Sequence, residues 1–252
     1  MPHRHHHGER HLASPLGENL EPCPACGERL SRCDALADVS EVAVPAEDID
    51  RKFRGAWGVF AATCGAYLAQ EPSFQMWFGH YVISQFGIDR VAREPIVHTK
   101  PFPPGSWRAR LGAQEARLDL VVSRAPGIRA IHYANRHYKS ADGTGLSALT
   151  DLAVISELKV AATQWEGLGH AEVVLDAVKL TVLLREFERV HPHVAPPLAY
   201  LCVLDNHPKR TYKTEVLEER LHADPEVERS RFELLVAEAS PRPALEATMS
   251  SG

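Results

Sequence analysis

Two charged side chains close a stretch of chain that is otherwise apolar. The run 152–155 (Leu-Ala-Val-Ile) is followed by Glu157 and, after Leu158, by Lys159. Such a run predicts a buried strand, and side chains two residues apart on a strand project from the same face. A carboxylate and an ammonium buried together cost free energy unless they pair or bind a metal ion. The end of this strand is therefore a candidate site.

A second carboxylate, Asp119, interrupts another apolar strand in the sequence Arg-Leu-Asp-Leu-Val-Val at 117–122. Two carboxylates at the ends of adjacent strands can hold a hard divalent cation such as Mg²⁺, with water and phosphate oxygens as further ligands. The cation lowers the pKa of a bound water and neutralises charge that develops on a phosphate. A nearby lysine can orient that water, take its proton or stabilise the transition state. Asp119, Glu157 and Lys159 therefore suit metal-assisted phosphodiester hydrolysis.

The elements that must position these residues follow from the spacing of apolar side chains. Helical spacing predicts helices at 53–68, 74–86 and 171–190, and a further helix is expected at 210–221. Strands are expected at 91–97, 110–122, 127–133, 152–161 and 196–205, and the stretch 231–239 is a final strand or helix. This order predicts an α/β fold with a central mixed sheet flanked by helices.

Composition places the chain among ordinary globular proteins. Of its 252 residues, 44% are hydrophobic and 24% are charged, which favours one domain with peripheral additions. No apolar run approaches the roughly 20 residues that span a bilayer, and no apolar signal-peptide core is visible. Five cysteines do not resemble a disulfide framework. We therefore expect a cytoplasmic protein without a membrane segment.

Charge is distributed unevenly along the chain. The net charge of −5 gives no global electrostatic argument for nucleic-acid binding. Residues 100–139, however, hold eight Lys and Arg against only Glu115 and Asp119. This segment suits a polyanion if its charges share a face, and is a solvated loop if they do not. Its candidate nucleic-acid contacts are Arg108, Arg110 and Arg117.

The N-terminal residues 1–40 differ in composition from the rest and are expected to form a His/Cys-rich appendage. Cys23 and Cys26 stand in a CPxCG sequence typical of a zinc knuckle, and Cys33 follows. A structural zinc site needs four ligands, so one of the leading histidines would have to complete the set. The alternative is half a motif in a tail. The main α/β domain is expected at 41–240, followed by a disordered tail at 241–252.

The two strand motifs together resemble those of the PD-(D/E)XK nuclease superfamily. Asp119 in Arg-Leu-Asp-Leu-Val-Val and Glu157-x-Lys159 in Val-Ile-Ser-Glu-Leu-Lys match its pattern, and the element order over residues 50–210 is similar. The resemblance implies a restriction-endonuclease-like core and cleavage of DNA or RNA that depends on Mg²⁺ or Mn²⁺. It also implies that Asp119, Glu157 and the carbonyl of Leu158 bind the metal and that Lys159 positions the attacking water.

Accessory residues are less well specified. Asp176 and Lys179 stand in a sequence that looks like the D-x-x-K-L found after E-x-K in some members of the superfamily. They share one helix face and either reach the site or form a surface ion pair, which is the interpretation we favour. Glu94, or a polar residue such as Gln75, could supply an additional polar group.

Two features depart from the superfamily pattern. Leu118 stands where a proline usually precedes the Asp, and 37 residues separate Asp119 from Glu157, so an insertion or an extra strand must intervene. Two other functions therefore stay open. One is a catalytically inactive nucleic-acid-binding or assembly module of the same fold, and the other is a zinc-knuckle protein with a structural α/β body. An oligomer is compatible with each.

The zinc hypothesis makes a direct prediction. If Cys23 is a zinc ligand, the wild-type protein contains stoichiometric zinc, and Cys23→Ser loses it because a hydroxyl is a much poorer zinc ligand than a thiolate. Elemental analysis of the two purified proteins measures this. Equal zinc contents, or none in the wild type, would contradict the hypothesis.

Overall fold

The computed structural model describes residues 46–112, 115–127, 147–161, 169–207 and 213–240. These ranges belong to a compact unit that extends from Ala43 to Gly252. The N-terminal appendage expected at 1–40, with its three candidate zinc ligands, and the tail expected at 241–252 lie outside the described residues. So does nearly all of the strand expected at 127–133.

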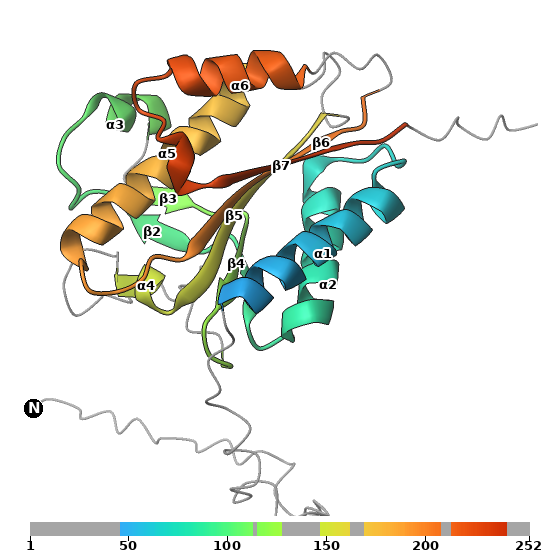
Figure 1. The fold of residues 1–252 in the computed structure, drawn as a ribbon, viewed down its shortest axis with the longest axis horizontal. Coiled ribbons are helices and arrows are strands. Elements are labelled where there is room, and N and C mark those ends of the chain that lie inside the picture. The colour runs from blue at the N-terminus through green and yellow to red at the C-terminus, as the bar shows by residue number, and fades with distance from the viewer. Residues whose placement is uncertain (1–45, 113–114, 128–146, 162–168, 208–212, 241–252) are drawn as a thin grey trace, which may run out of the picture. The chain divides into compact units, whose positions relative to one another are not determined.

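A mixed sheet of five strands forms the centre of this unit, in the order β1-β4-β5-β6-β7 (Figure 1). The pairs β1–β4 and β4–β5 are antiparallel, whereas the pairs β5–β6 and β6–β7 are parallel. Two further strands, β2 and β3, form a separate antiparallel pair. The strands are β1 (Val91–Arg93), β2 (Ile96–His98), β3 (Glu115–Arg117), β4 (Leu120–Ser123), β5 (Leu152–Val160), β6 (Leu198–Asp205) and β7 (Glu233–Glu238).

Helices cover both faces of the sheet, which confirms the expected α/β fold. Figure 1 shows α1 and α2 on one side and α5, with α3 and α6, on the other. None of the helices in the described ranges is long and apolar enough to cross a membrane. The helices are α1 (Ala46–Cys64), α2 (Glu71–Phe86), α3 (Ser106–Leu111), α4 (Ser147–Thr150), α5 (His170–Val190) and α6 (Thr214–Ala223), with a 3-10 turn at Arg229–Arg231.

The first helical layer is held to the sheet by aromatic side chains. Phe53 and Phe60 follow one another at helical spacing on α1, and both are fully buried. Phe53 stacks on Tyr200 of β6 with ring centroids 4.3 Å apart, and its edge contacts Phe78 of α2 at 5.6 Å. The chain leaves α2 through Gly87, whose φ of 89° is readily accessible only to glycine. These contacts fix α1 and α2 against the same face of the sheet.

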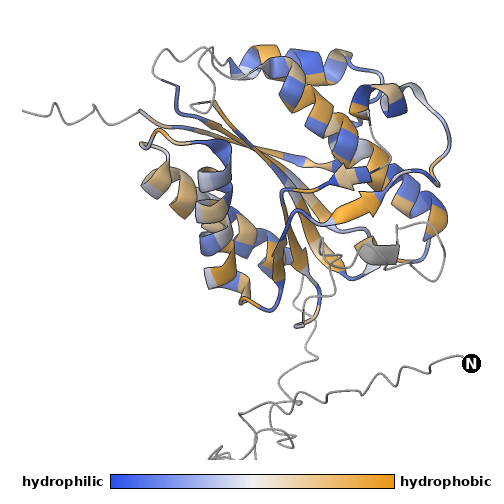
Figure 2. Cartoon of the chain, turned by 180° about the vertical axis from the view of Figure 1, so that it is seen from behind, coloured by the Kyte–Doolittle hydropathy of each residue, from blue (hydrophilic) through white to orange (hydrophobic). Residues whose placement is uncertain are grey.

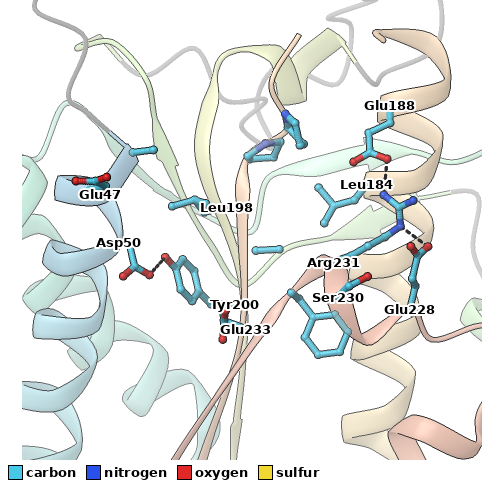
Figure 3. A pocket seen from close by; sticks show the side chains of 15 residues that line it. Glu47, Asp50, Leu184, Glu188, Leu198, Tyr200, Glu228, Ser230, Arg231 and Glu233 are labelled. Atoms are coloured by element: carbon cyan, nitrogen blue, oxygen red, sulfur yellow. Dashed lines mark hydrogen bonds and ion pairs between the residues drawn. The ribbon is translucent and has the colours of Figure 1, made fainter. Parts of the chain in front are cut away.

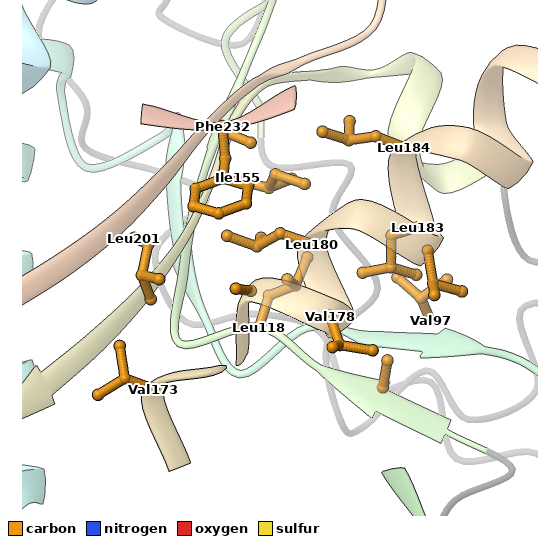
Figure 4. Close-up of a cluster of buried hydrophobic side chains, with 14 of the residues drawn as sticks. Val97, Leu118, Ile155, Val173, Val178, Leu180, Leu183, Leu184, Leu201 and Phe232 are labelled. Atoms are coloured by element: carbon orange, nitrogen blue, oxygen red, sulfur yellow. The ribbon is translucent and has the colours of Figure 1, made fainter. Parts of the chain in front are cut away.

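A second core lies between the sheet and α5. Figure 4 shows Ile155 of β5, Leu201 of β6 and Phe232 packed with Leu180 and Leu184 of α5. Figure 2 shows the hydrophobic residues concentrated on the strands and on the helix surfaces that face them. In β5 every residue except Lys159 is buried. The carboxylate of Glu157 therefore has no open face on which to reach water, whereas Lys159 keeps part of its side chain exposed.

Two of the expected strands are broken in the structure. The strand expected at 91–97 is divided into β1 and β2 by Glu94, which has a φ of 51°, and by Pro95. Proline lacks the N–H that a continuous ladder needs, so the chain leaves one sheet and enters the other. The strand expected at 110–122 is likewise divided. Residues 110–122 contain the end of α3, a helix that the sequence did not predict, followed by β3 and most of β4. Asp119 lies between β3 and β4.

Leucine truncation measures how much the central core contributes. Leu201 is fully buried in β6, whereas Leu68 has 59% of its surface exposed. Leu201→Ala is expected to lower the free energy of unfolding by about 2–5 kcal/mol, because a buried cavity replaces packed atoms. Leu68→Ala removes the same atoms from a wet surface and should change it by less than about 0.5 kcal/mol. Chemical denaturation of both variants is the measurement, and similar losses would contradict this core.

Candidate metal centre

The carboxylate of Asp119 lies against the end of β5. Its Oδ2 accepts a hydrogen bond from the backbone N–H of Leu158 at 2.8 Å, and its Oδ1 accepts one from Gln75 Nε2 at 3.0 Å. The reason is the register of the sheet: β4 begins one residue after Asp119, and Leu120 pairs with Ser156. The two sequence motifs are therefore brought together, with Asp119 beside the Glu-x-Lys segment of β5.

Glu157 is the most deeply buried acidic group of this region, with 1% of its surface exposed. Its Oε2 forms an ion pair with Lys179 Nζ at 2.8 Å. Its Oε1 is buried and has no hydrogen-bond partner among the residues that the structure describes. A carboxylate oxygen left in this state costs free energy unless a further group satisfies it.

Asp176 connects the two lysines of the region. Its Oδ1 lies 3.1 Å from Lys179 Nζ and its Oδ2 lies 3.0 Å from Lys159 Nζ. Asp176 is only 5% exposed, so our interpretation of Asp176 and Lys179 as a surface ion pair is wrong. The physical reason is that α5 packs directly on the sheet, which turns this i, i+3 pair toward Glu157 and Lys159.

A further acidic residue, Glu71, was missed by the sequence analysis. Its Oε1 lies 3.7 Å from Lys159 Nζ and accepts a hydrogen bond from Gln75 Nε2 at 3.4 Å. Glu71 and Pro72 fall in the gap between the helices expected at 53–68 and 74–86, but proline is favoured in the first turn of a helix, and α2 begins at Glu71. With that start of α2, the spacing of four between Glu71 and Gln75 would have placed both on one helix face.

These contacts define one ionic network, with Glu157 and Asp176 buried and the other charged members partly buried, drawn from four parts of the chain. Its charged members come from α2, the β3–β4 turn, β5 and α5, and Gln75 joins two of them. Arg93 of β1 supports it from outside by donating to Gln75 Oε1 at 2.5 Å. The members of the network are Glu71, Gln75, Asp119, Glu157, Lys159, Asp176 and Lys179.

Burial dominates the electrostatics of the carboxylates. Desolvation raises the pKa of Glu157 well above its ordinary value of 4.5; Lys179 opposes this effect and the nearby charge of Asp119 adds to it. Desolvation likewise raises the pKa of Asp119 and of Glu71. Each of these carboxylates is thus held in an environment that favours an additional positive charge.

The two lysines respond in the opposite sense. Burial alone would lower the pKa of Lys159, but the charges of Asp176 and Glu71 outweigh burial and raise it. Burial opposes charge on Lys179 in the same way, and Glu157 and Asp176 raise its pKa. Both ammonium groups therefore stay protonated at neutral pH.

The donor set fits a hard divalent cation. Four carboxylates against two ammonium groups leave two negative charges when all are ionised. The partnerless Oε1 of Glu157 is the kind of hard oxygen ligand that Mg²⁺ prefers. Nevertheless, within the described ranges no three His, Cys, Asp or Glu side chains are arranged to hold a metal ion as they stand. The ammonium groups of Lys159 and Lys179 are the cationic partners of Glu71, Glu157 and Asp176.

The other predicted accessory residue, Glu94, does not join this network. Its side chain is exposed on the turn between β1 and β2, and only its backbone N–H reaches the site, donating to the carbonyl of Asp119 at 3.4 Å. Of the two polar residues suggested as additional groups, Gln75 contacts a candidate metal ligand through its side chain and Glu94 does not.

The three predicted nucleic-acid contacts lie in different surroundings. Arg108 donates to the carbonyl of Phe102, so it organises a loop. Arg110 pairs with Asp224 at 2.8 Å and with a second carboxylate at 3.1 Å. Arg117 has an exposed side chain, and its carbonyl accepts a hydrogen bond from Lys179. Only Arg117 therefore borders the network.

A hollow of about 580 Å³ lies beside the network. Asp176 and Lys179 form part of its wall, together with Arg117 and Glu115 of β3 and Thr99. This hollow connects the surface to the lysine that holds Glu157. It is the place where a ligand could approach the network.

A larger hollow of about 720 Å³ contains no member of the network (Figure 3). Five carboxylates line it, and its one arginine, Arg231, is paired with Glu188 and Glu228 at 2.5 Å each. The hydroxyl of Tyr200 donates to Asp50 there at 2.7 Å. So acidic a surface repels a polyanion, and nucleic acid would not be expected to occupy it.

Comparisons with known proteins provide no assignment. No protein-family model matches the sequence, no curated protein matches it, and no solved structure matches the fold. The resemblance noted in the sequence therefore rests on the motif residues and on the order of the expected elements.

The raised pKa of Glu157 predicts a pH dependence of stability. The folded state holds a proton that the unfolded chain releases near pH 4.5, so the free energy of unfolding should fall as pH rises above 4.5 toward the folded pKa. Glu157→Gln removes this proton and should flatten the slope by up to about 1.4 kcal/mol per pH unit. Urea unfolding of metal-free protein from pH 4.5 to pH 8 measures both slopes.

The matched control for this prediction is Glu218→Gln. Glu218 is a carboxylate of α6 that pairs with Arg229 at 3.4 Å outside the network. This variant should keep the slope of the wild-type protein. If Glu157→Gln also kept it, the proton would not be held by Glu157.

Proposed function

We propose that this protein is a metal-dependent nuclease with a restriction-endonuclease-like core, acting on phosphodiester bonds of DNA or RNA. The observation that supports the proposal is the meeting of Asp119, Glu157 and Lys159, separated by up to 40 positions in the sequence, in one ionic network at adjacent strands. A pair of Glu157 and Lys159 on a solvated surface would be stabilised by water and would not need the charged groups of Asp176 and Glu71 around it. The buried Oε1 of Glu157, which has no hydrogen-bond partner within the described ranges, adds a position for a cation.

In this proposal Asp119, Glu157 and the carbonyl of Leu158 hold Mg²⁺ or Mn²⁺. When bound, the cation supplies charge neutralisation at the phosphate and a water of lowered pKa. The N–H of Leu158 and the amide of Gln75 fix the Asp119 carboxylate at 2.8 Å and 3.0 Å, so this ligand is oriented before any cation arrives.

Lys159 has the role of a fixed positive charge. Asp176 holds its ammonium at 3.0 Å and Glu71 lies 3.7 Å away, and these carboxylates raise its pKa. A lysine that keeps its proton cannot act as a general base, but it can donate hydrogen bonds to the attacking water or to a phosphate oxygen. The proposal therefore assigns Lys159 to positioning and charge stabilisation.

The surrounding parts of the chain have subsidiary roles in the proposal. The hollow is lined by Arg117 and Lys179 together with the carboxylates of Glu115 and Asp176, and it reaches the network. It is the path proposed for the phosphate, which the two cationic side chains would contact. The segment 1–40 is an appendage that binds zinc through Cys23, Cys26 and Cys33.

Cleavage assays test the proposal. The full chain is incubated with labelled single- and double-stranded DNA and RNA and with Mg²⁺ or Mn²⁺. Glu157→Gln and Lys159→Met are each expected to lower the cleavage rate by about 100-fold or more, because each removes a group that acts on the reacting phosphate or water. Glu218→Gln, outside the network, should cleave as the wild type does.

The other outcomes separate the competing functions. Cleavage that survives both network substitutions would contradict the assignment of the site. Salt-dependent binding of nucleic acid by the wild type without cleavage would indicate a catalytically inactive binding module instead.

A further inference from the structure

Lys179 occupies the position in which a cation would be expected. Its ammonium lies 2.8 Å from Glu157 Oε2 and 3.1 Å from Asp176 Oδ1, and it donates to the carbonyl of Arg117 at 3.1 Å. An ammonium group has three N–H donors, and here three acceptors surround it. The side chain of Lys179 is 16% exposed. It is therefore a fully coordinated internal cation.

We propose that Lys179 is a counter-ion that metal binding displaces from Glu157, an inference that rests on the metal site proposed above. A divalent cation and an ammonium compete for the same carboxylate, because each of them weakens the electrostatic interaction of the other with it. Lys179 thus holds Glu157 in place while the metal is absent and weakens the affinity of the site for the metal.

The geometry distinguishes the two lysines. Lys159 is held by Asp176 and Glu71, so it can stay in place while a metal binds Glu157. Lys179 is the group in contact with Glu157 itself. The remaining oxygen of Glu157 is buried and has no hydrogen-bond partner in the part of the chain that the structure describes, so it is the position at which a cation can first engage the carboxylate.

The structure also provides a place for the displaced side chain. Lys179 forms part of the wall of the hollow of about 580 Å³ that Arg117 and Thr99 also line. The lysine stem is flexible, so the ammonium can turn from the network into this hollow. There it adds positive charge to the space through which a phosphate would approach. Metal binding would in this way prepare the hollow for a phosphate ligand, and metal would bind first.

A purely structural role for Lys179 leads to the opposite result. If the lysine only keeps Glu157 in the correct position, its removal loosens the carboxylate and weakens metal binding. If it competes with the metal, its removal frees the carboxylate and strengthens metal binding. The direction of the change in affinity therefore decides between the two roles.

Calorimetric titration of the full chain with Mg²⁺ measures this direction. Mg²⁺ is the probe because it prefers oxygen ligands to the His and Cys side chains of the N-terminal segment. Lys179→Gln is expected to bind Mg²⁺ about tenfold tighter or more, since one charge-assisted contact to Glu157 no longer has to be broken. The control Lys52→Gln, which removes a lysine paired with Asp48 at 2.9 Å on α1, should leave the affinity unchanged.

Unchanged or weaker binding by Lys179→Gln, with the wild type binding normally, would overturn the role of Lys179 and leave the metal site intact. Absence of Mg²⁺ binding in every variant, in preparations that remain folded, would overturn the metal site and this inference together. The two failures are therefore distinguishable.

A measurement on the wild-type protein covers the case in which Lys179→Gln does not fold. Brief acetylation followed by mass spectrometry reports the accessibility of each lysine. Lys179 should react slowly without metal and severalfold faster with Mg²⁺, while Lys52 reacts equally in both conditions. Unchanged or slower labelling of Lys179 on addition of a Mg²⁺ concentration that saturates the site would overturn the displacement.

Discussion

The ion pair between Glu157 and Lys179 is the interaction on which the rest of the site depends. Glu157 projects from a strand with a neighbouring strand on each side and helices over both faces, so water cannot neutralise it. A buried carboxylate of this kind needs a partner from another element. The helix α5 supplies Lys179 and Asp176, and Asp176 in turn requires the second lysine, Lys159. The charge placed on one central strand thereby determines what the facing helix must carry.

The sequence was sufficient to predict the parts of the fold that depend on local pattern. Apolar spacing located α1, α2, α5, β5 and β6, and the carboxylates that interrupt apolar runs did lie together. The sequence was not sufficient where a residue's environment depends on contacts between elements that are distant in the chain. Charges three apart on α5 have the same pattern on a wet or a buried face, so the burial of Asp176 was not predictable. Two prolines did carry information: Pro95 indicated where the chain passes from one sheet to the other, and Pro72 indicated where α2 begins.

The two hollows described above differ in the charge of the residues that line them. The larger one is lined by Glu47, Asp50 and three further glutamates, and it would repel a polyanion. The smaller one borders the network and is lined by two cationic side chains, Lys179 and Arg117, and two carboxylates, Glu115 and Asp176. With a net charge of −5 the whole chain does not attract nucleic acid, so any such ligand must be drawn to the site by local charge. The position of the lysines matters more than their number.

Asp176 has a consequence for how such a chain can change over evolutionary time. One carboxylate bridges both lysines, at 3.0 Å and 3.1 Å, so its loss would remove an anionic partner from two positive charges at once. Neither lysine can be exchanged without changing the environment of the other. Substitutions at these positions are therefore epistatic, and the network is expected to be inherited or lost as a unit.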